Sequence, residues 1–185
     1  MRPLIAALAL FAAASHAAPA PKGKAAEATY FPTTEGAARV YEVRAGDKVE
    51  GRYTDVVTKV EKTDSRLQVT VRRDTPGSNS YDLLFVVSAE GLFGIAVSGP
   101  DDKPFPYLKS PARVGARWEM DGGTRFEVTR EEDTQVPAGK FRTVRVVQVD
   151  RNRTTTMWYA PGVGAVKMEL DGGRTIVLIE FKPRK

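Results

Sequence analysis

The sequence contains no cysteine, and its only histidine is His16, close to the N-terminus. The lack of cysteine excludes disulfide bonds, thiol nucleophiles and acylation at an N-terminal cysteine. Without a histidine after residue 16, the remaining chain cannot form histidine-dependent triads or the usual zinc, copper and haem ligand sets. No glycine-rich phosphate loop followed by Lys-Ser/Thr is present either. We therefore expect no metal, no cofactor and no catalytic residue in a protein that is not an enzyme.

With cysteine and histidine chemistry excluded, the remaining candidates for catalysis or metal binding are the carboxylates of Asp and Glu. The acidic candidates are Asp101-Asp102 and the run Glu131-Glu132-Asp133. A calcium loop needs acids at alternating positions around a central glycine, which neither run provides. Two carboxylates brought together by the fold could still serve a hydrolase, and we keep that function as the third possibility.

The N-terminus has the layout of a secretory signal. Arg2 precedes an unbroken run of apolar and small residues over 4–14, and small residues at Ser15 and Ala17 suit a signal peptidase. We predict a signal peptide over residues 1–17, a flexible tether over 18–28 and a single β domain over 29–185. An uncleaved anchor or a buried strand is the alternative for the apolar run. The prediction places the protein in the periplasm or outside the cell.

Basic residues are in modest excess but do not cluster. The formal net charge is +5, and the loss of Arg2 with the signal would reduce it to +4. Acids alternate with the basic residues, as in Arg125, Glu127, Arg130 and Glu131, and the main basic run is the final Lys-Pro-Arg-Lys. Nucleic-acid binding needs a basic patch, so we expect no nucleic-acid partner.

From Arg39 onward, apolar and polar residues alternate with a period of two. Leu67, Val69 and Val71 alternate with polar neighbours, and β-branched residues are frequent, which is typical of strands with one wet face. The segment 81–87 (YDLLFVV) is nearly continuously apolar and indicates a strand that is covered on both faces or lies at the sheet centre. No segment after the signal shows helical periodicity.

Short turns join these strands. Asp121-Gly122-Gly123 and Asp171-Gly172-Gly173 each stand between alternating segments, and Asp-Gly is a strong hairpin signal. We predict an all-β, antiparallel meander of about ten strands that forms a barrel, a half-barrel or a sandwich. Segments such as 124–133 (TRFEVTREED) cannot supply a lipid-facing apolar band, so we do not expect an integral membrane protein.

The segment 99–114 (GPDDKPFPYLKSPARV) interrupts the alternation with four prolines. Proline removes a backbone donor and is excluded from central strands. We predict a long loop here, laid over one end of the sheet. Its Phe105 and Tyr107 are candidate ligand-binding residues.

The segment 158–167 (WYAPGVGAVK) admits two interpretations. Pro161, Gly162 and Gly164 have the chemistry of a tight turn with a bulge, which favours a packed structural corner. Trp158 and Tyr159 could instead form an aromatic rim at the mouth of a ligand cavity. We favour the corner and keep Trp158 and Tyr159 as candidate ligand-binding residues.

Three stretches together resemble a known family. Residues 136–141 (VPAGKF), the valine-rich strand 144–149 and the segment 158–167 are similar to a pattern, VPAGxF…WYxPGVGxVK, in exported bacterial proteins of unknown function. The opening Tyr30-Phe31-Pro32 also resembles the start of those proteins. The resemblance implies a curved antiparallel sheet similar to the LolA/LolB lipoprotein carriers. It implies no catalytic residues.

Two functions rank above the hydrolase. The first is an exported, non-enzymatic β domain that binds an apolar small molecule or lipid-like ligand inside a curved sheet. The second is an interaction domain with a filled interior, whose sheet face or edge docks an envelope protein. An apolar cavity of several hundred Å³ would favour the first, and a packed interior with an exposed apolar patch would favour the second.

Overall fold

A computed structural model describes residues 29–95 and 104–184. The predicted signal peptide, the predicted tether and the pair Asp101-Asp102 lie outside the described residues. Within the described ranges no helix is long and apolar enough to cross a membrane. All regular structure there consists of twelve strands: β1 (Ala38–Ala45), β2 (Lys48–Thr63), β3 (Arg66–Asp74), β4 (Tyr81–Ser88), β5 (Gly91–Ile95), β6 (Phe105–Lys109), β7 (Arg117–Glu119), β8 (Arg125–Val136), β9 (Gly139–Asp150), β10 (Arg153–Ala160), β11 (Gly164–Glu169) and β12 (Arg174–Lys182).

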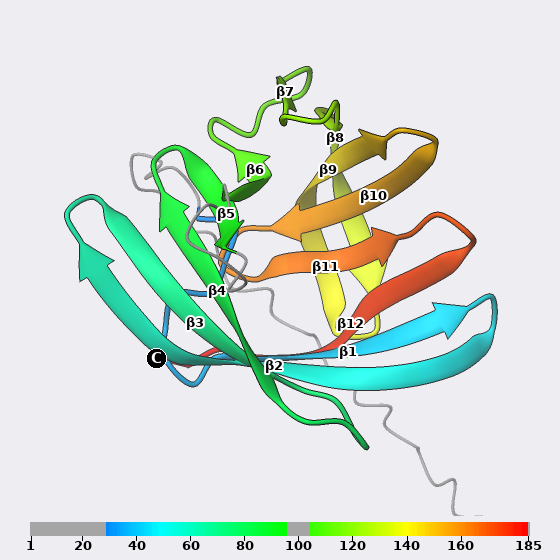
Figure 1. The fold of residues 1–185 in the computed structure, drawn as a ribbon. Helices are drawn as coiled ribbons and strands as arrows, with labels where there is room; N and C mark the ends of the chain where they lie inside the picture. Colours follow the sequence, from blue (N-terminus) through cyan, green and yellow to red (C-terminus); the bar gives the residue numbers. More distant parts are fainter. Residues whose placement is uncertain (1–28, 96–103, 185) are drawn as a thin grey trace, which may run out of the picture.

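The strands form one antiparallel sheet that curves into a nearly closed barrel (Figure 1). Their order is β6-β5-β4-β3-β2-β1-β12-β11-β10-β9-β8-β7. Strand β1 therefore lies in the middle and pairs with both β2 and β12, which joins the first and last parts of the chain. The predicted all-β antiparallel meander is confirmed, with twelve strands instead of about ten.

Aromatic side chains bridge the two edge strands, β6 and β7. The indole Nε1 of Trp118 in β7 donates a hydrogen bond of 3.0 Å to the carbonyl oxygen of Pro106 in β6. Phe126 stacks on Trp118 with ring centroids 5.2 Å apart and meets Phe105 edge-on at 5.6 Å. Strands β1–β6 and β7–β12 are the two halves of the barrel, and β6 and β7 are its two edges. These aromatic contacts therefore join the two halves at edges that are not paired by backbone hydrogen bonds.

The interior holds the main core. Residues of β3 alternate between solvent and core, so that Val69 and Val71 are fully buried while Arg72 is exposed. Valines and aromatic residues from both halves pack against them, including Val128 and Val146. Burial of a side chain of this size contributes about 1.5–3 kcal/mol to the stability of the folded protein. The face of each strand that carries the apolar residues therefore turns toward the interior.

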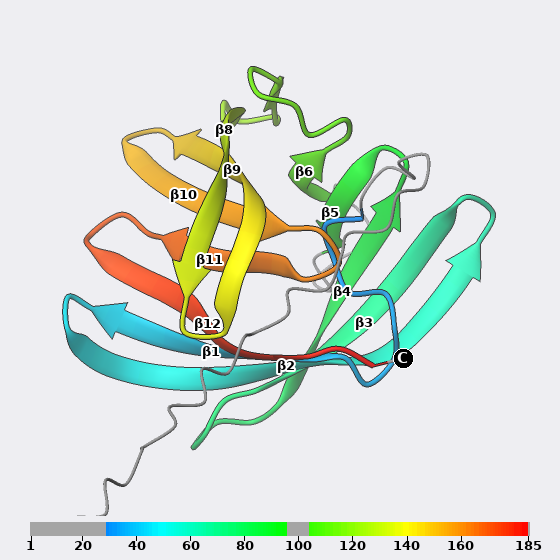
Figure 2. The same cartoon turned by 180° about the vertical axis from the view of Figure 1, so that it is seen from behind.

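A second core lies on the other side of β10–β12. The long hairpin of β8 and β9 bends across these strands, as Figure 2 shows from behind. Near its turn, the amide of Ala138 donates a hydrogen bond of 3.2 Å to the carbonyl oxygen of Leu178 in β12. Val136 from the hairpin joins Trp158, Val166 and Leu178 in this apolar cluster.

The prediction of a continuous loop over 99–114 is wrong for residues 105–109. They form β6, which pairs with β5 in spite of Pro106. A proline without an amide hydrogen is tolerated because β6 is an edge strand, whose second side has no neighbouring strand to accept a bond.

Candidate functional site

Three charged residues lie side by side across β1, β2 and β3. Arg39 in β1 pairs directly with Asp55 in β2, and Asp55 pairs directly with Arg73 in β3. Directly opposite residues of an antiparallel sheet project from the same face, so the strand register brings the three side chains together. All three line one partly open cavity. We call Arg39, Asp55 and Arg73 the charged row.

Asp55 is the centre of the charged row and binds both guanidinium groups. Arg73 makes a bidentate contact, with Nε 2.7 Å from Oδ1 and Nη2 2.9 Å from Oδ2. Nη2 of Arg39 lies 3.5 Å from Oδ2. The side chains of Arg39 and Asp55 are only 4% exposed, and that of Arg73 is 25% exposed. Burial lowers the pKa of Arg73, but the hydrogen bonds and charge of Asp55 outweigh it and raise that pKa above its usual value.

Aromatic rings surround the two guanidinium groups. Cζ of Arg73 lies 4.1 Å from the ring centroid of Tyr53, and Cζ of Arg39 lies 4.6 Å from that of Phe31. Tyr41 stacks on Tyr53 directly across the β1–β2 pair, with centroids 5.0 Å apart. Charges in such an apolar environment interact more strongly than in water, and each guanidinium gains a cation–π contact.

The turn between β10 and β11 forms the wall behind Arg39. Its Nη1 donates a long hydrogen bond of 3.4 Å to the carbonyl oxygen of Val163. Gly164 follows with a φ of +95°, and a Cβ at that position would lie 2.7 Å from Nη1 of Arg39. Gly162 also has a positive φ, +72°, at the tip of the turn after Pro161. The turn thus positions one end of the charged row.

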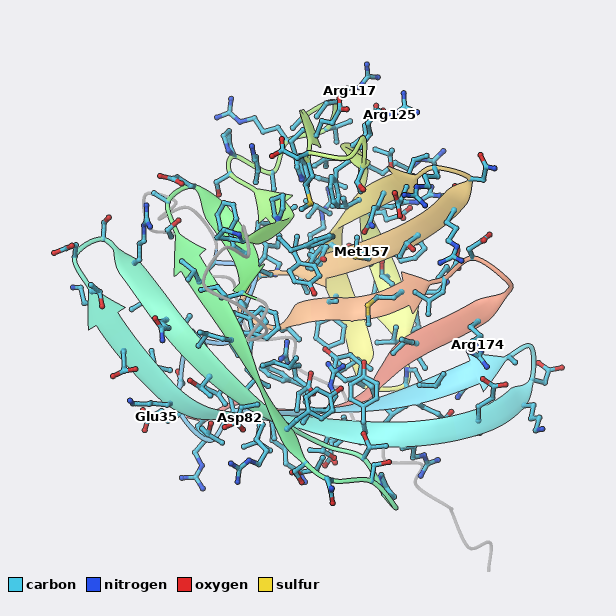
Figure 3. All side chains as sticks on the ribbon, viewed as in Figure 1. Glu35, Asp82, Arg117, Arg125, Met157 and Arg174 are labelled. Atoms are coloured by element: carbon cyan, nitrogen blue, oxygen red, sulfur yellow. The ribbon has the colours of Figure 1, made fainter. Side chains whose placement is uncertain are left out.

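The cavity at the charged row has a volume of about 250 Å³ and lies between the two halves of the barrel. One end is charged, and the remaining wall is apolar and aromatic. Figure 3 shows Met157 in the interior of the barrel, whereas Asp82 and Arg174 point outward. The other lining residues are Phe31, Tyr41, Tyr53, Leu83, Phe85, Leu92, Tyr107, Tyr159, Ala165, Met168 and Ile176.

The tyrosine hydroxyls of the cavity are neutral donors. Burial raises the pKa of Tyr41, Tyr53, Tyr107 and Tyr159, and for Tyr159 it does so strongly. Tyr41 donates to the carbonyl oxygen of Ala165 at 2.8 Å. Tyr159 has the thioether sulfur of Met157 as acceptor at 3.1 Å. Because a thioether is a weak acceptor, the hydroxyl of Tyr159 can also serve a ligand in the cavity.

The four predicted ligand-binding residues lie in different places. Tyr159 and Tyr107 line the cavity. Phe105 lies next to it, with its ring centroid 4.7 Å from that of Tyr107 and its edge toward Phe126. Trp158 points to the opposite face of β10 and belongs to the second core. Contact of Tyr107 or Tyr159 with a ligand stays a prediction.

Trp158 is held by polar and cationic neighbours on that opposite face. Its Nε1 donates a hydrogen bond of 2.7 Å to Oε1 of Glu132 in β8. Lys167 and Arg145 lie on the two neighbouring strands directly opposite Trp158, 4.7 and 5.5 Å from its ring centroid. Trp158 is therefore a packing residue between β10 and the β8–β9 hairpin in this structure.

The prediction of the site missed the charged row, although the sequence contains a signal for it. Arg39 is two residues from Tyr41, Asp55 lies between Tyr53 and Val57, and Arg73 follows Val71 at the same spacing. Each charged residue is therefore two positions from a buried residue and projects from the same, inward face of its strand. Their phase in the alternation, and not their charge, indicates that these three side chains face inward.

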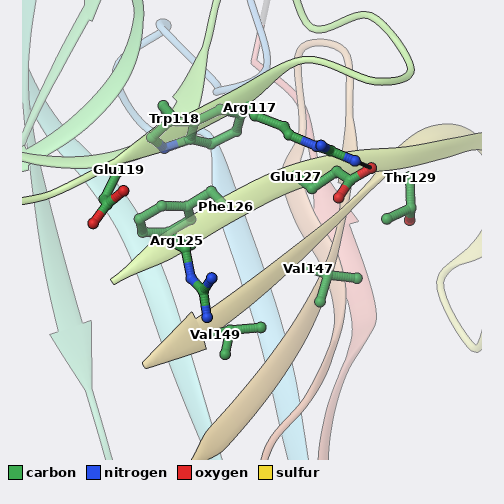
Figure 4. A pocket seen from close by; sticks show the side chains of 9 residues that line it. All are labelled: Arg117, Trp118, Glu119, Arg125, Phe126, Glu127, Thr129, Val147 and Val149. Atoms are coloured by element: carbon green, nitrogen blue, oxygen red, sulfur yellow. Dashed lines mark hydrogen bonds and ion pairs between the residues drawn. The ribbon is translucent and has the colours of Figure 1, made fainter. Parts of the chain in front are cut away.

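A larger hollow of about 630 Å³ lies on β7, β8 and β9 (Figure 4). Its wall includes Arg117, Arg125, Glu127, Val147 and Val149. An exposed ion pair spans it, with Nη2 of Arg117 3.0 Å from Oε1 of Glu127. These charges are exposed and paired with one another, and such pairs are weak in solvent. The hollow therefore offers a ligand fewer specific contacts than the cavity at the charged row.

No group of three or more acidic or histidine side chains suitable for a metal occurs among residues 29–95 and 104–184. In particular, the two carboxylate oxygens of Asp55 are engaged by the guanidinium groups of Arg39 and Arg73. The cavity therefore combines a charged end with an apolar and aromatic wall.

Comparison with known proteins shows the fold. No family model matches the chain, and no curated protein matches it. Among solved structures, it is similar to a Bacteroides fragilis protein with a YmcC-like fold, inferred to be exported, with a TM-score of 0.60 and 18% identity. It is also similar to an inferred lipoprotein of Parabacteroides distasonis, with a TM-score of 0.56 and 18% identity. Each alignment covers 84% of this chain and 99% of the other.

Proposed function

We propose that the protein is an exported, non-enzymatic binding protein that holds an apolar, lipid-like ligand in the cavity of its barrel. The observation that carries this proposal is the cavity of about 250 Å³ between the two halves, with its mostly apolar and aromatic wall. Ligand sites in proteins are typically concave and mostly apolar, with a few polar groups that fix the orientation of the ligand. An apolar void of about 150 Å³ is already enough to bind benzene.

Export is supported by two independent observations. The first 17 residues have the layout of a cleavable signal. The two structural neighbours are described as exported and as a lipoprotein, respectively. N-terminal sequencing of protein recovered from the envelope fraction should give Ala18 as the first residue, and retention of Met1 would contradict the proposal.

Hydrolysis has little support in the cavity. Asp55 is its only carboxylate among the described lining residues, and both oxygens bind guanidinium groups. Glycosidase-type chemistry needs two carboxylates on either side of the substrate, one of them protonated. Both oxygens of Asp55 are occupied by guanidinium contacts, and the described cavity wall supplies no second carboxylate.

Partner docking also has less support than ligand binding. In the described part of the chain, the exposed large apolar side chains are Val49, Tyr81 and Val114. They belong to β2, to β4 and to the connection between β6 and β7, so no shared element gathers them into a patch. A docking surface normally presents a contiguous apolar area.

Native mass spectrometry of the protein purified from its own host tests the proposal. We expect a retained small molecule that is lost when Ala165→Met fills the cavity, because Ala165 lines it. Ala38→Met is the matched control, since the side chain of Ala38 points to the face opposite that of Arg39. Retention by Ala165→Met, or loss from both variants, would contradict binding in this cavity.

A further inference from the structure

We infer that the ligand of this cavity carries an anionic head group, a carboxylate or a phosphate, which binds between Arg39 and Arg73. The inference rests on the proposed binding function and names the chemical class of the ligand. It follows from the charge of the row, from the contacts of its two arginines and from the shape of the cavity beside them.

The charge of the row is not balanced. Two guanidinium groups share one carboxylate, and no other acidic or basic side chain lines the described cavity wall. The row therefore brings a net charge of +1 into a site where Arg39 and Asp55 are almost fully buried. An uncompensated buried charge is costly. A second anion in the cavity would compensate it.

The two arginines are held to different degrees. Arg73 uses Nε and Nη2 in short bonds to Asp55. Arg39 is held by longer polar contacts among the described residues, at 3.5 Å to Asp55 and 3.4 Å to the carbonyl oxygen of Val163, and it also interacts with the hydroxyl of Tyr41. Charge-assisted hydrogen bonds are normally about 2.7–2.9 Å long, and a guanidinium has five N–H donors. Arg39 therefore has donor capacity for a further acceptor.

A cation is a poorer fit at this position. Asp55 would have to bind it, but its oxygens already accept from Arg73 and face Arg39. Both arginines would repel the newcomer at close range. The same geometry attracts a carboxylate or phosphate, whose oxygens can accept from a guanidinium fork.

The apolar wall next to the charged row favours a ligand with an apolar tail. Leu83, Met157, Met168 and Ile176 line the same cavity as Arg39 and Arg73. The volume of about 250 Å³ corresponds to roughly eight non-hydrogen atoms, at the ~30 Å³ that one water occupies in the liquid. Counting the atoms of the head group, a carboxylate of about six carbons or a phosphate monoester of about three fills this volume, and a longer alkyl chain extends through the open side of the cavity.

Calorimetry with four probes of equal carbon number tests the head group. The probes are octanoate, octyl phosphate, octanol and octylammonium, each titrated into the purified protein at fixed pH and salt. We expect octanoate or octyl phosphate to bind at least about tenfold more tightly than octanol, and octylammonium to bind most weakly. The order of the two anions distinguishes a carboxylate head group from a phosphate.

Variants of two adjacent arginines supply the matched comparison. Arg73→Gln should weaken octanoate binding about tenfold and leave octanol within twofold. Arg72→Gln should change neither affinity, because Arg72 points to the other face and binds Asp82. If Arg73→Gln does not fold, Arg73→Lys keeps the charge and loses the bidentate fork, and a loss of about threefold for octanoate alone is expected.

The outcomes separate the two claims. If none of the four probes binds, the proposed binding function is wrong and the head-group inference is overturned with it. If octanol binds as tightly as both anions, the cavity still binds apolar ligands, but the inference about the head group is wrong and the charged row is structural. Tightest binding of octylammonium would overturn the inference in the same way.

Discussion

The guanidinium of Arg39 lies against the backbone of Gly164, so closely that a Cβ at position 164 would be 2.7 Å from Nη1. The residue is also required to be glycine by its φ of +95°. One glycine thus serves two purposes, since it allows the turn and makes room for a buried charge. The segment 158–167 is thus a structural corner whose Gly164 also borders Arg39, a residue of the cavity.

We predict that Gly164→Ala is more destabilising than Gly162→Ala. Both glycines have positive φ, but nothing lies within 4 Å of the Cβ position at Gly162. Gly162→Ala should cost about 1–2 kcal/mol from backbone strain alone. Gly164→Ala should cost more than this, because the guanidinium of Arg39 must also move away from the added Cβ. Urea unfolding of both variants checks this, and equal losses would contradict the role assigned to Arg39.

Much of the fold could be predicted because it follows from local patterns. The alternation around Val69 and Val71 determines their inward face, and the Gly-Gly pair at 122–123 has the positive φ that the hairpin needs. Strand β6 could not be predicted in the same way. It contains a proline, and its pairing with β5 is possible because it lies at the edge of the sheet.

The site was less predictable because its residues are brought together by register. Arg39 and Asp55 are 16 positions apart, and Arg73 is a further 18 along the chain. Each one alone resembles a solvent-facing charge. Only the direct pairing of β1 with β2 and of β2 with β3 makes them neighbours. Two of the predicted aromatic residues, Tyr107 and Tyr159, do line the same cavity.

Trp158→Ala should destabilise the protein without affecting ligand retention. The indole is 7% exposed in the second core, and its loss should cost about 3–5 kcal/mol. Because Trp158 faces away from the cavity, the folded fraction should retain ligand normally. Urea midpoints and native mass spectrometry of the same variant measure the two effects. A stable variant that has lost its ligand would contradict this placement.

Glu42 should make stability fall in acid. Hydrogen bonds from Arg52 and Arg44 lower the pKa of its carboxyl below the ordinary value of 4.5. The folded protein therefore binds the proton less readily than the unfolded chain. The stabilisation is fully present above about pH 4.5, and it is lost as the pH falls through the lowered pKa. Urea unfolding between pH 6 and pH 3 measures this loss.

Glu42→Gln should flatten that acid dependence, because the variant has no proton to take up at this position. Glu180→Gln is the control: Glu180 is an exposed strand carboxylate paired with Lys182, and solvent screens such a pair. Its acid dependence should follow that of the unmodified protein. An unchanged slope for Glu42→Gln would exclude Glu42 as the source.

The charged row allows a direct comparison of two cross-strand Arg–Asp pairs that differ in burial. Asp55 lies opposite Arg73 on the inner face, and Asp82 lies opposite Arg72 on the outer face. Asp55→Asn leaves the buried guanidinium of Arg39 and the partly buried one of Arg73 without a carboxylate and should cost about 3–5 kcal/mol. Asp82→Asn breaks a half-exposed pair and should cost no more than about 1 kcal/mol. If Asp55→Asn is as stable as the unmodified protein, water and not Asp55 compensates the two arginines.

The same variants connect stability with ligand binding. Asp55→Asn raises the net charge of the row from +1 to +2 by removing its only carboxylate, so an anion in the cavity should stabilise this variant more than the unmodified protein. Thermal unfolding with and without octanoate measures this, and the rise in Tm should be larger for Asp55→Asn than for Asp82→Asn. Equal rises in Tm for the two variants would mean that the binding of octanoate does not depend on the net charge of the charged row.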